Sequence, residues 1–191
     1  MMKKILVINA NPKPQSLCKS IADLYSQVAG VKHNVQSVAV ANMHFELSLD
    51  QGYDKVLPLE PDLLRFQEQV IWCDHLVIIS PVWWGNIPAK FKGVIDRTFL
   101  PGFAFKYKGK KGRLEKLLHG RTSQLIFTLD TPVFWYKYVK GNLIYKQLKS
   151  AVLGFSGIKN LSSTYFGPVL SSTEEKRDKW LKKTQKLASN I

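Results

Sequence analysis

The chain has 191 residues, 45% hydrophobic side chains and a formal net charge of +14. This size and composition predict one globular domain over residues 1–191, large enough to bury a substantial core. No apolar run approaches the roughly 20 residues that a membrane-spanning helix needs. The two cysteines, Cys18 and Cys73, have no metal-ligand spacing, so we expect reduced thiols, no metal site and a cytoplasmic location.

Short apolar runs alternate with helical patterns along the chain. The strand candidates are residues 4–9, 35–40, 76–80, 124–128 and 161–166. Helical spacing of apolar residues follows Ser16 and recurs over 63–71, 91–99 and 143–152, and a capping-box pattern at 172–175 predicts a last helix beginning at Ser172. This alternation predicts an α/β fold, a three-layer sandwich whose five-stranded parallel sheet has helices on both faces. The strand order expected for such a sheet is the flavodoxin-like 2-1-3-4-5.

Two stretches interrupt the alternation of strands and helices. Residues 42–59 are polar and aromatic with few helix signals, and residues 101–120 are basic and punctuated by glycine. We expect both to be long surface excursions, which in compact domains are often functional.

The most informative segment follows the third strand candidate and reads Ser-Pro-Val-Trp-Trp-Gly-Asn-Ile-Pro from Ser80 to Pro88. A buried parallel strand normally ends at a ligand crevice on its carboxyl side. Two adjacent indoles at a loop tip suit a flat aromatic ligand, because aromatic faces stack. The short turn also leaves backbone N–H groups free to point at that ligand.

The same segment resembles the flavin loop of the NAD(P)H:quinone oxidoreductase family. The resemblance is carried by Pro81, Trp83, Trp84, Pro88-Ala89, Lys92-Gly93, Asp96-Arg97 and the downstream run from Pro101 to Phe105. It extends from about Ile5 to about Val169, so it covers most of the chain. It implies a flavodoxin-like homodimer that carries FMN, or FAD, and uses NAD(P)H to reduce quinones or other aromatic oxidants in a ping-pong cycle of two-electron hydride transfer.

The resemblance also implies which positions hold the flavin. The phosphate site falls on the loop before the first helix, at Asn11, Lys13, Ser16, Leu17 and Cys18. A helix N-terminus there attracts anions, although Ser16 also suits a simple helix cap. The ribityl chain and ring fall on Pro81, Val82, Trp83, Trp84, Gly85 and Asn86, and the N1/O2 edge falls on Thr128, Leu129 and Asp130. We expect the Asp130 carboxylate to turn away and cap its loop, because a negative charge near N1 would oppose reduction.

Two further positions are implied to be catalytic. Tyr136 aligns with a family tyrosine and Asn142 with a family histidine, both of which stabilise charge on the reduced flavin. Asn142 can donate a hydrogen bond but cannot take up a proton. The aromatic residues around them, 134–138, suit either core packing or a pocket wall that a partner subunit completes.

Other functions stay open at this point. An azo or nitro compound reductase would have a similar site, and some relatives are regulatory flavoprotein subunits of potassium efflux systems, in peripheral contact with a membrane protein. The basic runs at 106–116 and 176–186 can mark nucleic-acid binding, but no nucleic-acid-binding motif accompanies them. A solubilising surface that attracts anionic NAD(P)H and FMN is the favoured interpretation.

Overall fold

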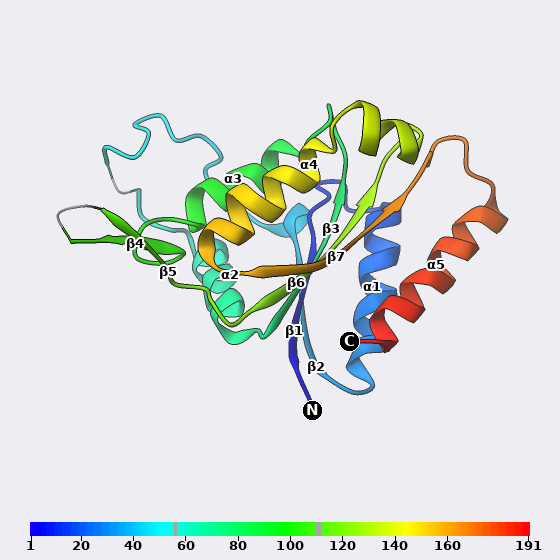
Figure 1. Cartoon of the computed structure of the whole chain (residues 1–191), viewed down its shortest axis with the longest axis horizontal. Coiled ribbons are helices and arrows are strands. Elements are labelled where there is room, and N and C mark those ends of the chain that lie inside the picture. Colours follow the sequence, from blue (N-terminus) through cyan, green and yellow to red (C-terminus); the bar gives the residue numbers. More distant parts are fainter. Residues whose placement is uncertain (56, 110–111) are drawn as a thin grey trace.

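A computed structural model describes residues 1–55, 57–109 and 112–191. The chain forms a five-stranded parallel sheet between two layers of helices (Figure 1). The strands are β1 (Lys4–Asn9), β2 (Asn34–Ala39), β3 (His75–Pro81), β6 (Thr122–Thr128) and β7 (Lys159–Phe166), in the order β2-β1-β3-β6-β7. The predicted parallel sheet and its order are therefore confirmed. β1 has the predicted bounds, β6 and β7 begin two residues earlier than predicted and end as predicted, and the ends of β2 and β3 differ by one residue.

The helices cover both faces of the sheet. α1 (Leu17–Gly30) and α5 (Glu174–Ser189) lie on one face. α2 (Pro61–Trp72), α3 (Ala89–Thr98), α4 (Leu143–Lys146) and the π-helical continuation η3 (Gln147–Gly154) lie on the other. Alternate residues of each strand feed the two cores, with Ile5 and Val7 toward α1 and Leu6 and Ile8 toward α2. This burial on both faces explains why β1 and β3 contain continuous apolar runs. None of the described helices has the length and apolarity of a membrane span.

The start of α5 differs from the predicted capping box. Thr173, not Ser172, is the N-cap, and its hydroxyl accepts a hydrogen bond from the Lys176 backbone N–H at 3.3 Å. The Ser172 hydroxyl instead donates to the Val169 carbonyl. Either Ser172 or Thr173 could cap this helix from the sequence. Because the Ser172 hydroxyl is bonded to Val169, Thr173 is the cap.

The excursion at 101–120 contains structure that the sequence analysis did not predict. β4 (Phe105–Lys108) and β5 (Arg113–Lys116) form an antiparallel hairpin at one end of the molecule (Figure 1). Lys106 and Lys108 reach across to Glu115, at 3.3 and 2.7 Å. Cross-strand ion pairs of this kind stabilise a pair of strands. Because these strands are charged and lack alternating apolar residues, the sequence pattern does not predict them. Lys110 and Lys111 lie outside the described residues.

The excursion at 42–59 is tied to α3 by a buried arginine. The Arg97 guanidinium is 1% exposed and donates to the carbonyls of Glu46 at 2.6 Å and Pro58 at 2.9 Å. It also pairs with Glu60 at 2.9 Å. One helical turn earlier, a side chain at Gly93 would collide with Leu47 of the same excursion. Packing against the excursion therefore explains why residue 93 is a glycine and residue 97 an arginine.

Arg97→Met should lower the free energy of unfolding by about 3 kcal/mol, because it strands two carbonyls and the Glu60 carboxylate. Lys92→Met is the control on the same helix. It breaks a partly exposed pair with Asp96 and should cost less than about 1 kcal/mol. Urea unfolding of the two variants measures the difference. Equal losses would show that the buried arginine contributes no more than a surface pair.

His75 is a buried polar residue at the start of β3, far from the carboxyl ends of the strands. Its ring is 2% exposed, and Nδ1 shares a hydrogen bond of 2.7 Å with the Thr122 hydroxyl. Nε2 is buried and has no partner among the described residues. Burial, together with the nearby positive groups Lys3 and His33, lowers the pKa of His75 to about 4. The folded protein therefore holds this imidazole in its neutral form at pH 7.

This burial predicts a loss of stability in mild acid. An unfolded histidine has a pKa of about 6.5, so the unfolded chain takes up the proton first as the pH falls. The stabilisation is fully present above about pH 6.5 and is lost on approach to pH 4, with a contribution of about 2 kcal/mol lost between pH 7 and 5. His75→Phe should flatten this part of the curve, whereas His44→Gln, at a side chain that is 93% exposed, should not. Identical pH profiles for His75→Phe and the parent would assign the acid sensitivity to another group.

Candidate active site

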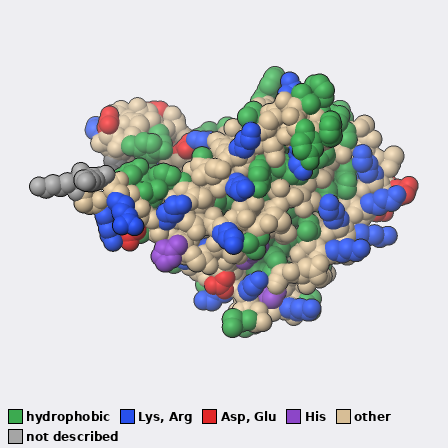
Figure 2. Space-filling view, in the orientation of Figure 1, with side chains coloured by type: hydrophobic (Ala, Val, Ile, Leu, Met, Phe, Trp, Pro, Cys, Tyr) green, Lys and Arg blue, Asp and Glu red, His purple; other side chains and the backbone are tan. Residues whose placement is uncertain are grey.

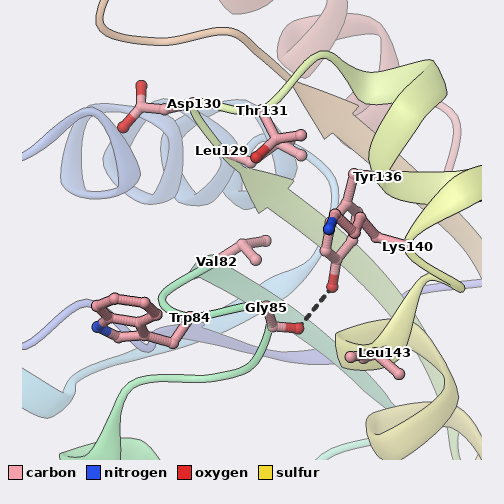
Figure 3. A pocket seen from close by; sticks show the side chains of 9 residues that line it. All are labelled: Val82, Trp84, Gly85, Leu129, Asp130, Thr131, Tyr136, Lys140 and Leu143. Atoms are coloured by element: carbon pink, nitrogen blue, oxygen red, sulfur yellow. Dashed lines mark hydrogen bonds between the residues drawn. The ribbon is translucent and has the colours of Figure 1, made fainter.

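A cavity of about 400 Å³ lies at the carboxyl ends of β3 and β6 (Figure 3). Its wall comes from the loop after β3, the loop after β6 and the helical segments that follow. The lining residues are Val82, Trp84, Gly85, Leu129, Asp130, Thr131, Tyr136, Lys140 and Leu143. The volume lies within the range of about 300–1,000 Å³ that is usual for ligand and cofactor sites.

The loop after β3 is a tight turn with an unusual backbone. Trp83 and Asn86 exchange two backbone hydrogen bonds, of 2.8 and 2.9 Å. Between them Trp84 (φ 49°) and Gly85 (φ 81°) are both left-handed, which is typical of a type I′ turn. Glycine suits position 85, but the tryptophan at 84 costs about 1–2 kcal/mol of strain, and its indole is fully exposed. Within the described chain, the N–H groups of Trp84 and Gly85 donate to no protein acceptor.

The loop after β6 presents a second pair of free donors. Leu129 is held by backbone bonds to Phe166 and Val169, each of 3.0 Å. The Asp130 carboxylate accepts the Leu170 N–H at 2.7 Å and points away from the cavity (Figure 3). The carboxylate turns away as expected, but it holds the loop after β7 and not its own loop. The N–H groups of Asp130 and Thr131 have no protein acceptor among the described residues.

Tyr136 joins the three segments of the wall. It lies on the π-helical segment η2 (Trp135–Val139) and is buried. Its hydroxyl donates to the Gly85 carbonyl at 2.8 Å and accepts the Ile144 N–H at 3.0 Å. Burial raises the pKa of Tyr136, so the phenol keeps its proton at neutral pH. Because that proton is committed to Gly85, Tyr136 can donate to a ligand only after this bond breaks.

Asn142 does not reach the cavity wall. It is left-handed (φ 54°) at the start of α4, and its side-chain oxygen accepts a hydrogen bond from the Tyr165 hydroxyl at 2.8 Å. The sequence analysis overlooked three residues that do line the cavity, Thr131, Lys140 and Leu143. Lys140 had a usable signal, because a residue four places after Tyr136 on a helical segment shares its face.

The predicted phosphate loop is well ordered by its own side chains. Asn11 accepts the Lys13 N–H at 2.9 Å, and Ser16 caps α1 by accepting the Lys19 N–H at 3.2 Å. Cys18 lies 3.2 Å from the Thr128 hydroxyl, which connects this loop to the end of β6. Burial raises the pKa of Cys18 to about 11, so the thiol is not a nucleophile at neutral pH.

The structure therefore brings part of the predicted set together. Six predicted residues line the cavity, namely Val82, Trp84, Gly85, Leu129, Asp130 and Tyr136. The other ten are not part of its wall, namely Asn11, Lys13, Ser16, Leu17, Cys18, Pro81, Trp83, Asn86, Thr128 and Asn142. Asn86 also cannot offer its N–H to a ligand while that group is bonded to Trp83.

The fold of the chain matches that of known proteins. A family model described as flavodoxin-like fold matches residues 3–188. The chain belongs to this family.

Several known proteins are similar to this chain over most of its length. A ribosyldihydronicotinamide dehydrogenase (quinone) of Pongo abelii is 27% identical, with 92% of this chain and 86% of that protein covered. An "uncharacterized NAD(P)H oxidoreductase" of Haemophilus influenzae is 26% identical, with 86% and 83% covered. The structure of an FMN-dependent NADH-azoreductase from Bacillus anthracis in complex with FMN has a TM-score of 0.69 at 22% identity, with 99% of each chain covered.

Tyr136→Phe should loosen the cavity wall. The substitution removes both hydrogen bonds of the hydroxyl and leaves the Gly85 carbonyl and the Ile144 N–H unpaired, at a cost of about 1–3 kcal/mol in the free energy of unfolding. Tyr138→Phe is the matched control, because that ring is exposed on the same segment. Chemical denaturation measures both variants. Equal stability of Tyr136→Phe and the parent would show that the hydroxyl does not hold the three segments together.

Proposed function

We propose that this protein is a flavin-dependent NAD(P)H oxidoreductase that reduces quinones and uses FMN as its cofactor. The observation that carries the proposal is the cavity between the ends of β3 and β6. Its two rims each present free backbone N–H groups, and apolar side chains line the space between them. A flavin ring has apolar faces and acceptor atoms along its edge, so the donors and the apolar wall suit it. The names of the similar proteins support an oxidoreductase reaction with NAD(P)H and a quinone as the two substrates.

The chain's own residues divide the work of holding the cofactor. The N–H groups of Trp84 and Gly85 would bind one edge of the ring, and those of Asp130 and Thr131 the other. Val82, Leu129 and Leu143 would keep water from its faces. The N-terminus of α1, together with Lys13, would attract the phosphate. Bound FMN would supply the two-electron chemistry, and the protein orientation and electrostatics. One shared space for NAD(P)H and quinone gives a ping-pong cycle.

We propose that the working unit is a homodimer. At η2 and the residue before it, Phe134, Trp135 and Tyr138 are 70%, 48% and 68% exposed, and Figure 2 shows hydrophobic side chains gathered over this region. Exposed aromatic patches of this kind mark interaction surfaces. Beside them lies an open hollow of about 680 Å³ lined by Asp130, Thr131, Pro132, Phe134 and Trp135. A second copy seated here would complete the wall of the substrate space.

The basic surface suits the anionic substrates. Lysine and arginine side chains are spread over the face shown in Figure 2 and along α5, and acidic side chains are few. Such a field raises the local concentration of anions such as NAD(P)H and FMN. The open aromatic hollow also favours bulky aromatic oxidants, so azo compound reduction is a second candidate. Relative turnover of a quinone and an azo dye separates the two.

Protein reconstituted with FMN should show a bound-flavin absorbance band. We expect this band to bleach anaerobically when NAD(P)H is added and to return when a quinone is added. Gly85→Val should lose the band, because its left-handed backbone (φ 81°) forms the cavity rim. Gly120→Val, at a similar φ of 83° in open space away from the cavity, should keep it.

A parent protein that neither binds FMN nor bleaches would overturn the proposed function. Equal flavin affinity in Gly85→Val and Gly120→Val would place the cofactor outside this cavity.

A further inference from the structure

We infer that Lys140 is the residue that favours the negatively charged, reduced form of the flavin in this site. The inference rests on the proposed function and goes beyond it, because it assigns a new residue to the electrostatics of the cavity. The resemblance implied that this role belongs to Tyr136 and Asn142.

Lys140 is the one basic side chain among the nine residues that line the cavity. It follows η2, and its backbone N–H donates to the Trp135 carbonyl at 3.0 Å, which extends the π-helical turn. It lies four residues after Tyr136, on the same face. Figure 3 shows its side chain running from this backbone into the cavity beside the Tyr136 ring. Lysine side chains are positively charged at neutral pH.

Nothing among the described residues neutralises this charge. Lys140 makes no recorded ion pair within the parts of the chain that the structure covers. Asp130 is the one acidic residue in the cavity wall. Its carboxylate is bonded to the Leu170 N–H and points away from the cavity. The net field inside the cavity is therefore positive.

The two residues expected to act on the flavin are otherwise engaged. The Tyr136 proton is bonded to Gly85. The Asn142 oxygen is bonded to Tyr165, and Asn142 lies outside the wall. Both are neutral side chains held by the protein, whereas Lys140 is a cation with no ion-pair partner among the described residues. This contrast selects Lys140.

The chemistry requires a positive group of this kind. In the proposed reaction NAD(P)H would give up a hydride, which carries two electrons and one hydrogen, and would leave as NAD(P)⁺. Reduced FMN would then carry one more hydrogen and one more negative charge than oxidised FMN. A cation about 6 Å away, at an effective dielectric constant of about 20, favours the charged ring by up to about a hundredfold. Because Lys140 is solvent-exposed, screening reduces this to about tenfold.

The test compares Lys140→Met with Lys140→Arg and Lys149→Met, each reconstituted with FMN. Lys149 provides the matched control, because it is another lysine of the following helix and lies over the Tyr145 ring, outside the cavity. The measurements are the dissociation constant of oxidised FMN and the two-electron midpoint potential of the bound flavin.

Lys140→Met should weaken binding of reduced relative to oxidised FMN by about tenfold, which lowers the midpoint potential by about 30 mV. Its affinity for oxidised FMN should change less than about threefold, Lys140→Arg should restore the potential, and Lys149→Met should match the parent. A potential in Lys140→Met equal to that of Lys149→Met overturns the inference. A loss of oxidised-FMN affinity with an unchanged potential also overturns it, because Lys140 would then be a phosphate anchor.

Measurements on the parent protein distinguish a failure of the role of Lys140 from a failure of the proposed function. If it binds FMN and bleaches with NAD(P)H while Lys140→Met keeps the parent potential, only the role of Lys140 is wrong. If the parent binds no FMN, the proposed function fails and the role of Lys140 fails with it.

Discussion

The pairing of β3 with β6 decides where every part of the candidate site lies. The strands are parallel and Pro81 lies opposite Thr128, so the loops that follow them leave the sheet at the same edge. Thr128 is the junction. Its carbonyl accepts the Val82 N–H at 2.8 Å, and its hydroxyl lies 3.2 Å from Cys18 at the start of α1. The cavity rims and the phosphate loop are therefore fastened to one residue at the end of β6.

The Tyr136 hydroxyl links the segments that surround the cavity through its two hydrogen bonds. Residue 84 is a tryptophan in a left-handed backbone, and strain of this kind persists only where the surroundings hold it. Two bonds between Trp83 and Asn86 close the turn from within, and the bond from Tyr136 to Gly85 holds it from outside. The same hydroxyl satisfies the Ile144 N–H at the first turn of α4. In this turn the Gly85 carbonyl is therefore occupied, whereas the N–H groups of Trp84 and Gly85 have no acceptor among the described residues.

The sequence alone predicts the sheet, its order and the two site loops, because buried parallel strands and a Pro-Trp-Trp-Gly turn are strong local signals. It does not predict contacts between distant residues. Arg97 binds Glu46 and Glu60, which are 51 and 37 positions away, and the hairpin of β4 and β5 depends on ion pairs instead of apolar alternation. Tyr136 lines the cavity, and only the structure shows that its hydroxyl proton is already bonded to the Gly85 carbonyl.

If the cavity holds a flavin as proposed, the position of Lys140 would reconcile two opposing needs of the bound ring. Apolar walls protect the ring from water, yet they also weaken any charge that reduction leaves on it, because a low dielectric penalises an unpaired ion. A buried lysine would meet that charge at a large desolvation cost of its own. Lys140 lies at the end of η2, with its backbone at the solvent and its side chain directed into the cavity. Because Lys140 is exposed as well as part of the cavity wall, its ammonium group could stay hydrated while its field acted on the proposed ring.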